Sequence, residues 1–181
     1  MKKFTLIAFL SFFMFSFANL NAQAVAHVNS NDILNAMPAF KEAQTKLEAE
    51  ANRHKTEVER QQKEIQEIYT KAQKDIESVQ NKSDAEKQAM MQKLQPVEQN
   101  LQQKQQTLAQ YQQKATQDLA KMEGELTEPI YTKIENAIAE VGKKKNISYI
   151  FDLATAAKNG SLVYFQGGTD LTSEVKKLLG L

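Results

Sequence analysis

A heptad-like apolar pattern runs from Pro38 to about Gly142, more than half of the chain. Its seam residues recur at alternating steps of four and three, which average the 3.5-residue period of a coiled coil. Residues 81–86 interrupt the pattern, and Ser83 followed by Glu86 forms a capping box that starts a new helix. The sequence therefore predicts two long antiparallel helices joined by a tip near residues 80–86. The seam residues are Leu47, Ala51, His54, Val58, Gln61, Ile65, Ile68 and Ala72 in the first half, and Leu94, Val97, Leu101, Lys104, Leu108, Tyr111 and Ala115 in the second.

The first residues have the features of a signal peptide. Two lysines precede an apolar run over residues 4–18, and small residues follow it. A transmembrane anchor is the alternative, but this run is shorter than the roughly 20 residues that a membrane span requires. We therefore expect residues 1–24 to be a cleavable signal peptide that exports the protein, with cleavage after Ala22 or Ala24.

Short strand patterns lie on both sides of the hairpin. Alternation over residues 25–29 predicts a strand, and residues 30–32 offer caps for a short turn before Pro38, which suits the first position of a helix. After the hairpin, β-branched and aromatic residues predict two further strands at 147–152 and 162–165.

A last amphipathic helix completes the chain, with Asp170 or Thr172 as its cap. Its apolar residues are Leu171, Val175, Leu178 and Leu179. The fold class is therefore α+β, with a helical arm inserted between the first and second strands of a small body. The predicted parts are a body segment at 25–37, the arm at 38–125 with its tip near 80–86, and a second body segment at 126–181.

The divided body is too small to be stable alone. Roughly 55 residues shared between two chain segments make a marginal core, and unpaired strand edges invite a partner. We therefore expect an oligomer, a trimer, formed through the body strands. The residues predicted to form it are Val25, Val28, Ile147, Tyr149, Phe151, Leu162 and Tyr164.

Composition argues against several classes of function. The net charge is +1, and residues 41–93 carry equal numbers of acidic and basic side chains, so the electrostatic route to nucleic acid is missing. The two histidines, His27 and His54, belong to different elements, and there is no cysteine. Gly167-Gly168 is not followed by the Lys-Ser/Thr of a phosphate loop. We therefore expect neither an enzyme nor a bound metal or cofactor.

Two biased segments have alternative interpretations. Glutamine is dense from Gln95 to Gln117, which fits either a prion-like tract or a solvated helix face, and the intact heptad favours the helix face. Residues 143–145 are three lysines at the end of the second helix. They either stabilise that helix end or form a patch for anionic lipid.

The order of these elements resembles the Skp/OmpH family of periplasmic chaperones. The resemblance covers the whole mature chain and rests on the strand at 25–29, the segment 33–41 that leads into the arm, residues 129–138 where the arm ends, the strand at 149–152 and the helix start at 170–172. It implies a homotrimer whose helical arms enclose a cavity and hold unfolded outer-membrane proteins without a nucleotide. The best-known members are strongly basic, whereas this chain is nearly neutral, and no lipopolysaccharide site matches residue by residue. A membrane surface or lipopolysaccharide remains a further partner that the resemblance suggests.

Apolar residues around the tip are the candidates for binding clients. They are Ile76, Val79, Met90 and Met91. Flexible methionine side chains adapt to varied partners, although Val79 and Met90 could instead close the seam of the hairpin. The other function to consider is a structural coiled-coil spacer or adaptor in the cell envelope. A spacer requires a well-packed seam, whereas this seam contains alanine, histidine and glutamine.

Overall fold

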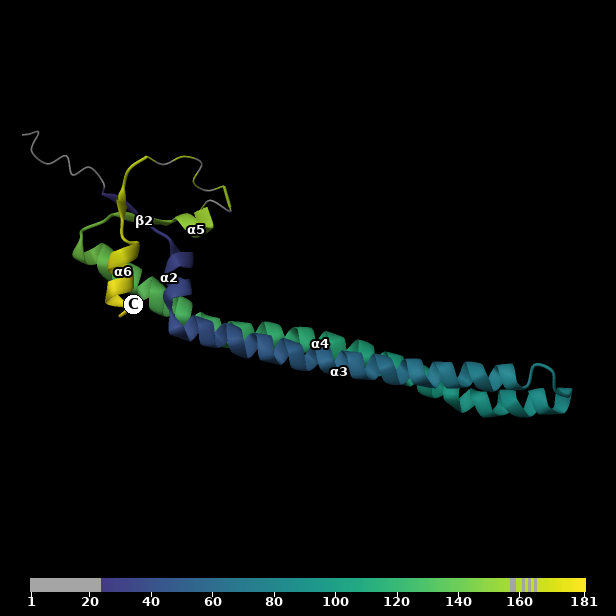
Figure 1. The fold of residues 1–181 in the computed structure, drawn as a ribbon. Helices are drawn as coiled ribbons and strands as arrows, with labels where there is room; N and C mark the ends of the chain where they lie inside the picture. Colours follow the sequence, from purple (N-terminus) through teal and green to yellow (C-terminus); the bar gives the residue numbers. More distant parts are fainter. Residues whose placement is uncertain (1–23, 157–158, 161, 163, 165) are drawn as a thin grey trace, which may run out of the picture. The chain divides into compact units, whose positions relative to one another are not determined.

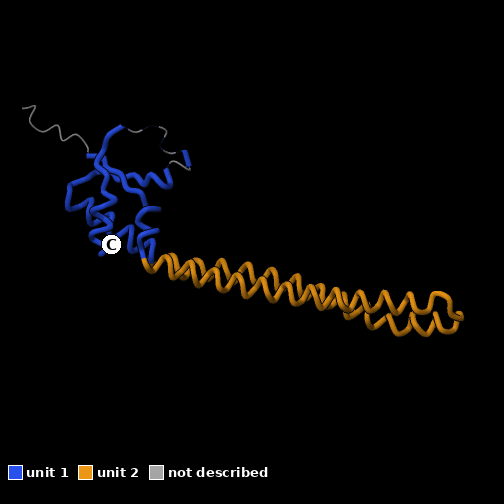
Figure 2. Tube along the Cα trace, viewed as in Figure 1, with its two compact units in different colours: residues 1–37, 130–181 blue, residues 38–129 orange. Residues whose placement is uncertain are grey.

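The computed structural model describes residues 24–156, 159–160, 162, 164 and 166–181. The predicted signal peptide therefore lies outside the described residues except for Ala24. The chain forms two compact units, one of residues 1–37 with 130–181 and one of residues 38–129 (Figure 2). Long helices and a small sheet confirm the predicted α+β class.

Two long helices form the hairpin, α3 (Pro38–Ser78) and α4 (Asp84–Lys144) (Figure 1). Pro38 occupies the first helical position, as predicted, where its missing N–H costs nothing. Helix α3 ends at Ser78, just before the tip predicted near residues 80–86. The capping box at the start of α4 is confirmed, because the Ser83 N–H donates to Glu86 Oε2 at 3.0 Å and the Glu86 N–H donates to Ser83 Oγ at 3.4 Å.

Helix α4 continues through two internal prolines, Pro96 and Pro129. Each proline lacks the N–H that would close an i→i−4 hydrogen bond. Neither proline breaks the helix. Beyond Pro129, the apolar residues Ile130, Ile134 and Val141 are buried, so this end of α4 belongs to a core.

Three short parallel strands form one sheet in the order β2-β1-β3. They are β1 (Val25–Val28), β2 (Tyr149–Asp152) and β3 (Thr169–Asp170). The register pairs Val25 with Tyr149 and Val28 with Asp152. The whole hairpin lies between β1 and β2 in the chain, as predicted.

The predicted strand at 162–165 is wrong. Leu162 and Tyr164 belong to no strand, and residues 163 and 165 lie outside the described residues. The third strand is β3, which follows Gly167 and Gly168, whose φ angles are 98° and 88°. These left-handed conformations, which glycine adopts without strain, turn the chain onto the edge of β1. The pairing is continued by the Leu171 N–H, which donates to the His27 carbonyl at 2.9 Å.

Three short helices complete the core of this unit. They are α2 (Ser30–Ala36), α5 (Leu153–Ala156) and α6 (Thr172–Leu178). Helix α2 packs against α5 and α6, and α5 also contacts β1 and β2. The most deeply buried large side chains are Val28, Ile33, Leu171 and Val175. The cap of α2 is Asn29, one residue before the predicted caps, and its side chain accepts from the Asp32 N–H at 3.3 Å.

The Asp152 carboxylate connects the beginning of this unit to the chain that returns after the hairpin. It accepts hydrogen bonds from the Ser30 N–H at 3.0 Å and the Ser30 hydroxyl at 2.6 Å. It also accepts from the Ala154 N–H at 3.1 Å and the Thr155 hydroxyl at 2.8 Å. Burial raises the pKa of Asp152, but these hydrogen bonds outweigh burial and leave the pKa below its usual value.

Replacing Asp152 with alanine is expected to destabilise this unit by about 1–3 kcal/mol at neutral pH, since the partly buried N–H groups of Ser30 and Ala154 lose their charged acceptor. A lowered pKa means that the carboxylate stabilises the fold above its ordinary pKa of about 3.9, and that this contribution is lost as the pH falls through the folded-state value. Urea unfolding at pH 7 and pH 3 measures both effects. The gap between wild type and Asp152→Ala should shrink at pH 3. Asp32→Ala, at an exposed position, is the control and should lower the free energy of unfolding by less. An equal loss for both variants would contradict the stabilising role of the Asp152 carboxylate.

Candidate functional site

The seam between α3 and α4 is only partly apolar. All seven seam residues predicted on α4 are buried or half-buried. On α3, Ala51 is exposed and Glu50 takes the half-buried position instead. The reason is local: Glu50 reaches both the ring of His54 and the guanidinium of Arg53.

His54 lies in the middle of this seam with only 5% of its surface exposed. Its Nδ1 lies 2.8 Å from the Tyr111 hydroxyl, and the two rings meet edge to face. Its Nε2 lies 3.2 Å from Glu50 Oε1, yet the geometry is not that of a hydrogen bond, and this nitrogen has no hydrogen-bond partner among the described residues. The contact is therefore electrostatic at most. A buried polar pair thus occupies a place where a tight coiled coil has leucine.

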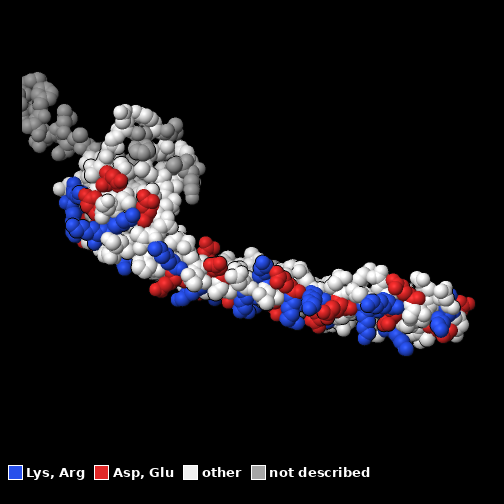
Figure 3. Space-filling model, viewed as in Figure 1, with Lys and Arg blue, Asp and Glu red and all other residues white. Residues whose placement is uncertain are grey.

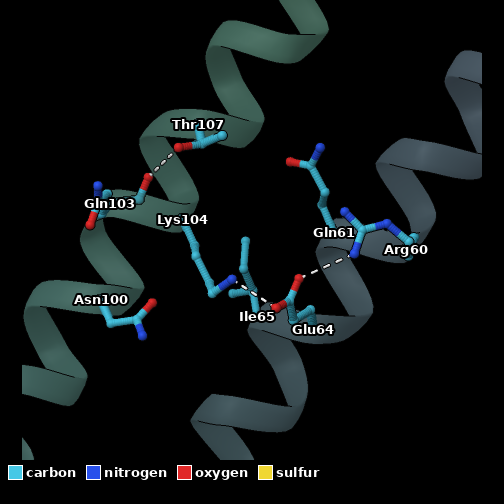
Figure 4. A pocket seen from close by; sticks show the side chains of 8 residues that line it. All are labelled: Arg60, Gln61, Glu64, Ile65, Asn100, Gln103, Lys104 and Thr107. Carbon is cyan, nitrogen blue, oxygen red and sulfur yellow. Dashed lines mark hydrogen bonds and ion pairs between the residues drawn. The ribbon is translucent and has the colours of Figure 1, made fainter.

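Further toward the tip, polar residues from both helices surround a hollow of about 310 Å³ (Figure 4). Lys104, a predicted seam residue, donates to Glu64 across the hairpin at 2.7 Å. Both side chains are about one-third exposed or more, so their pairing adds little stability. Its effect is to align the two helices at the cost of apolar packing. The lining residues are Arg60, Gln61, Glu64, Ile65, Asn100, Gln103, Lys104 and Thr107.

The residues predicted to bind clients have different environments. Met91 is 72% exposed and Ile76 is 48% exposed. The next step of three in the seam after Ala72 reaches half-buried Asp75, so Ile76 lies one place away from the seam. Val79 and Met90 are half-buried. Exposed Tyr69 was not among the predicted residues. Its sequence signal was an aromatic side chain directly after the seam residue Ile68.

A second apolar surface lies on the outer face of the sheet. Tyr149 and Phe151 are 53% and 41% exposed, and their β1 neighbours Val25 and His27 point to the same face. Among the other predicted oligomer residues, Tyr164 is exposed, and Ile147 and Leu162 are half-buried. Val28 is 1% exposed and packs inside the core of its own unit. It is therefore not accessible to a partner.

Charged side chains of both signs alternate over the visible surface of the hairpin (Figure 3). Many form pairs within one helix, such as Arg60 with Glu57 at 2.8 Å and Lys114 with Asp118 at 2.8 Å. In the lysine run at 143–145, Lys144 and Lys145 each lie 2.6 Å from a carboxylate of the same chain. No large field of one sign follows from these pairs.

Two features are absent from the described part of the chain. Within it, no three residues of the types that ligate metals are gathered as a metal-binding group. No helix in that part is both long and apolar enough to cross a membrane.

The long hairpin inserted into a small parallel sheet places the chain among α+β proteins with a helical arm. The profile of the outer membrane protein (OmpH-like) family matches residues 24–179, and the chain belongs to this family. The predicted resemblance is thus confirmed. It is a periplasmic family of chaperones rather than enzymes, and its role concerns outer-membrane proteins. No curated protein matches the chain in sequence comparison.

Removing the Tyr111 hydroxyl tests whether the buried pair matters to the hairpin. Tyr111→Phe is expected to destabilise the hairpin by about 1–3 kcal/mol, because buried His54 Nδ1 loses its partner. Tyr69→Phe, at an exposed position of the same hairpin, should change stability little. The double variant His54→Leu with Tyr111→Phe should recover the loss, since an apolar pair needs no hydrogen bond. Urea unfolding followed by circular dichroism compares the four proteins. Equal stability of wild type and Tyr111→Phe would contradict this interpretation.

Proposed function

We propose that this protein is an exported holdase chaperone that binds unfolded outer-membrane proteins in the periplasm and keeps them from aggregating without ATP. Membership of the OmpH-like family supports the general role. The observation that carries the specific proposal is the hairpin, in which exposed apolar side chains such as Ile76 and Met91 lie near the tip of two helices with a polar seam.

Holding without chemistry requires weak binding to many sequences. A protein that binds the unfolded state withdraws it from aggregation by mass action. Apolar side chains on an adaptable surface suit this task, since one shaped pocket would select a single partner. Met91 has the flexible, polarizable side chain that adapts best. We therefore assign client binding to the tip cluster, which consists of Ile76, Val79, Met90 and Met91.

A rigid spacer, the other function considered, is less well supported. Its stiffness would require a continuous apolar seam. This hairpin instead has the His54–Tyr111 pair and the Glu64–Lys104 ion pair between its helices. These polar positions favour a hairpin that deforms around a client.

Assembly as a homotrimer is the second part of the proposal. Parallel sheets normally have both faces covered, whereas Tyr149 and Phe151 of this small sheet stay about half exposed, although Leu162 and Tyr164 line a hollow together with Phe151. Further copies of the same chain would bury this face together with Val25, Tyr164, Ile147 and Leu162. In such a trimer, clients would lie in a cavity between the arms. Export by the segment 1–24 would place the trimer in the periplasm. The paired Lys144 and Lys145 do not favour lipopolysaccharide or a membrane surface as an additional partner.

Dilution of a urea-denatured outer-membrane barrel protein into the purified chaperone tests the holding function. Light scattering should remain low at a stoichiometric amount of trimer. Met90→Ser with Met91→Ser is expected to weaken client affinity about tenfold, since each side chain loses buried apolar area. Met90→Leu with Met91→Leu keeps that area and serves as the control. Aggregation that proceeds unchanged with the wild-type protein would exclude the holdase function.

Phe151→Asp is expected to dissociate the trimer, because an unpaired carboxylate would be buried in the interface. Tyr131→Asp changes an exposed aromatic residue of the same unit that does not belong to the sheet, and should leave the trimer intact. Analytical ultracentrifugation over a range of concentrations measures both variants. A wild-type protein that sediments as a monomer at every concentration would refute the trimer.

A further inference from the structure

The outward face of α4 carries a regular row of glutamines. Their spacing alternates between four and three residues, interrupted once at Ala109, so the row follows the heptad of the seam on the opposite side of the helix. All of these side chains are exposed. We call this set the amide row: Gln92, Gln95, Gln99, Gln102, Gln106 and Gln113.

The amide row differs from the remaining surface of the hairpin in its interactions. None of its carboxamides makes a hydrogen bond or an ion pair to another described residue, whereas charged neighbours such as Lys114 and Asp118 are paired. The outward positions of α3 include the charged residues Glu48, Lys55 and Glu59. On α4 the neutral amides thus follow one another along the row, whereas on α3 exposed glutamines such as Gln62 and Gln66 are interspersed with charged residues.

The chemistry of a carboxamide indicates what such a face can bind. Each glutamine has two N–H donors and one carbonyl acceptor, which is the same combination that a peptide group offers. An unfolded polypeptide has one N–H and one carbonyl at nearly every residue without an intramolecular partner. These groups are present whatever the side chains are. A neutral row also neither attracts nor repels a client according to its charge.

We propose that the amide row binds the main chain of unfolded polypeptides, with its carboxamide N–H groups donating to peptide carbonyls and its carboxamide oxygens accepting from peptide N–H groups. This inference rests on the proposed holdase function and adds a sequence-independent contact to the apolar tip cluster. Each hydrogen bond replaces one to water, so each contributes little. Many such contacts in a row hold a client and still let it leave quickly.

A pair of variants separates this contact from general surface effects. Gln102→Ala with Gln106→Ala removes two carboxamides from the row, keeps the net charge and leaves no side-chain donor or acceptor in their place. Gln62→Ala with Gln66→Ala makes the same change at exposed positions of α3. Because alanine is the strongest helix former, both variants should fold as the wild type does. Circular dichroism and sedimentation check this point.

The probe is an unfolded peptide with the sequence of one barrel strand, made in two forms. One form has ordinary amides, and in the other alternate amides are replaced by esters, which removes N–H donors while the side chains stay the same. Wild type and the α3 variant should bind the amide form at least about fivefold more tightly, as expected for the loss of one or two net hydrogen bonds. The α4 variant should show a smaller preference than either of these two proteins, since two of the six carboxamides are gone.

Each other outcome overturns a different claim. Equal binding of both peptide forms by wild type would refute main-chain recognition while leaving the holdase function standing. An unchanged preference in the α4 variant would place the recognition elsewhere. A changed oligomeric state in that variant, with client affinity unaltered, would mean that the row contacts another copy of the chain. Failure of wild type to bind either peptide or a denatured barrel protein would refute both the row and the proposed function.

Discussion

The parallel pairing of β1 with β2 is the interaction on which the body of this protein depends. It joins Val25–Val28 to Tyr149–Asp152 and so closes a loop that contains the whole hairpin. Such closure costs conformational entropy, although the cost grows only slowly with loop length. The Asp152 carboxylate helps to offset it, because it accepts two hydrogen bonds from Ser30 across 122 positions of the sequence. The Thr172 hydroxyl adds another long-range bond by accepting from the Asn29 N–H at 3.0 Å.

The hairpin, in contrast to the body, depends on local helix signals rather than on long-range strand pairing. Its helices form from local signals, namely Pro38 at the first turn of α3 and the Ser83–Glu86 box at the start of α4. Between the two helices, the polar pairs His54–Tyr111 and Glu64–Lys104 occupy seam positions where apolar side chains would otherwise pack. Polar seam positions lower stability while specifying how helices align. The two pairs specify how the helices align, and an incompletely apolar seam agrees with the proposed function, in which the hairpin accommodates varied clients.

The two apolar surfaces suggest that one unit serves assembly and the other serves client binding. The exposed sheet face, with Tyr149 and Phe151, belongs to the unit whose strands require a cover. The exposed tip residues Ile76 and Met91 belong to the hairpin unit. Assembly and client binding are therefore assigned to separate surfaces, and a variant of one surface can be tested without altering the other. The balanced charges leave both surfaces to act mainly through apolar burial and hydrogen bonding.

The sequence by itself determined the hairpin, its cap at Ser83, its insertion between two strands and the exposure of Ile76. Each of these depends on periodicity or on residues within one helical turn. Only the tertiary structure decided that the third strand is Thr169–Asp170, that Glu50 replaces Ala51 in the seam, and that Asp152 connects to Ser30. The β-branched and aromatic residues at 162–165 have a high strand propensity, but a strand also needs a partner. The segment that pairs with the open edge of β1 is the one whose backbone can reach it. That reach is set by the positive φ of Gly167 and Gly168 and by the rest of the fold, which no local pattern contains.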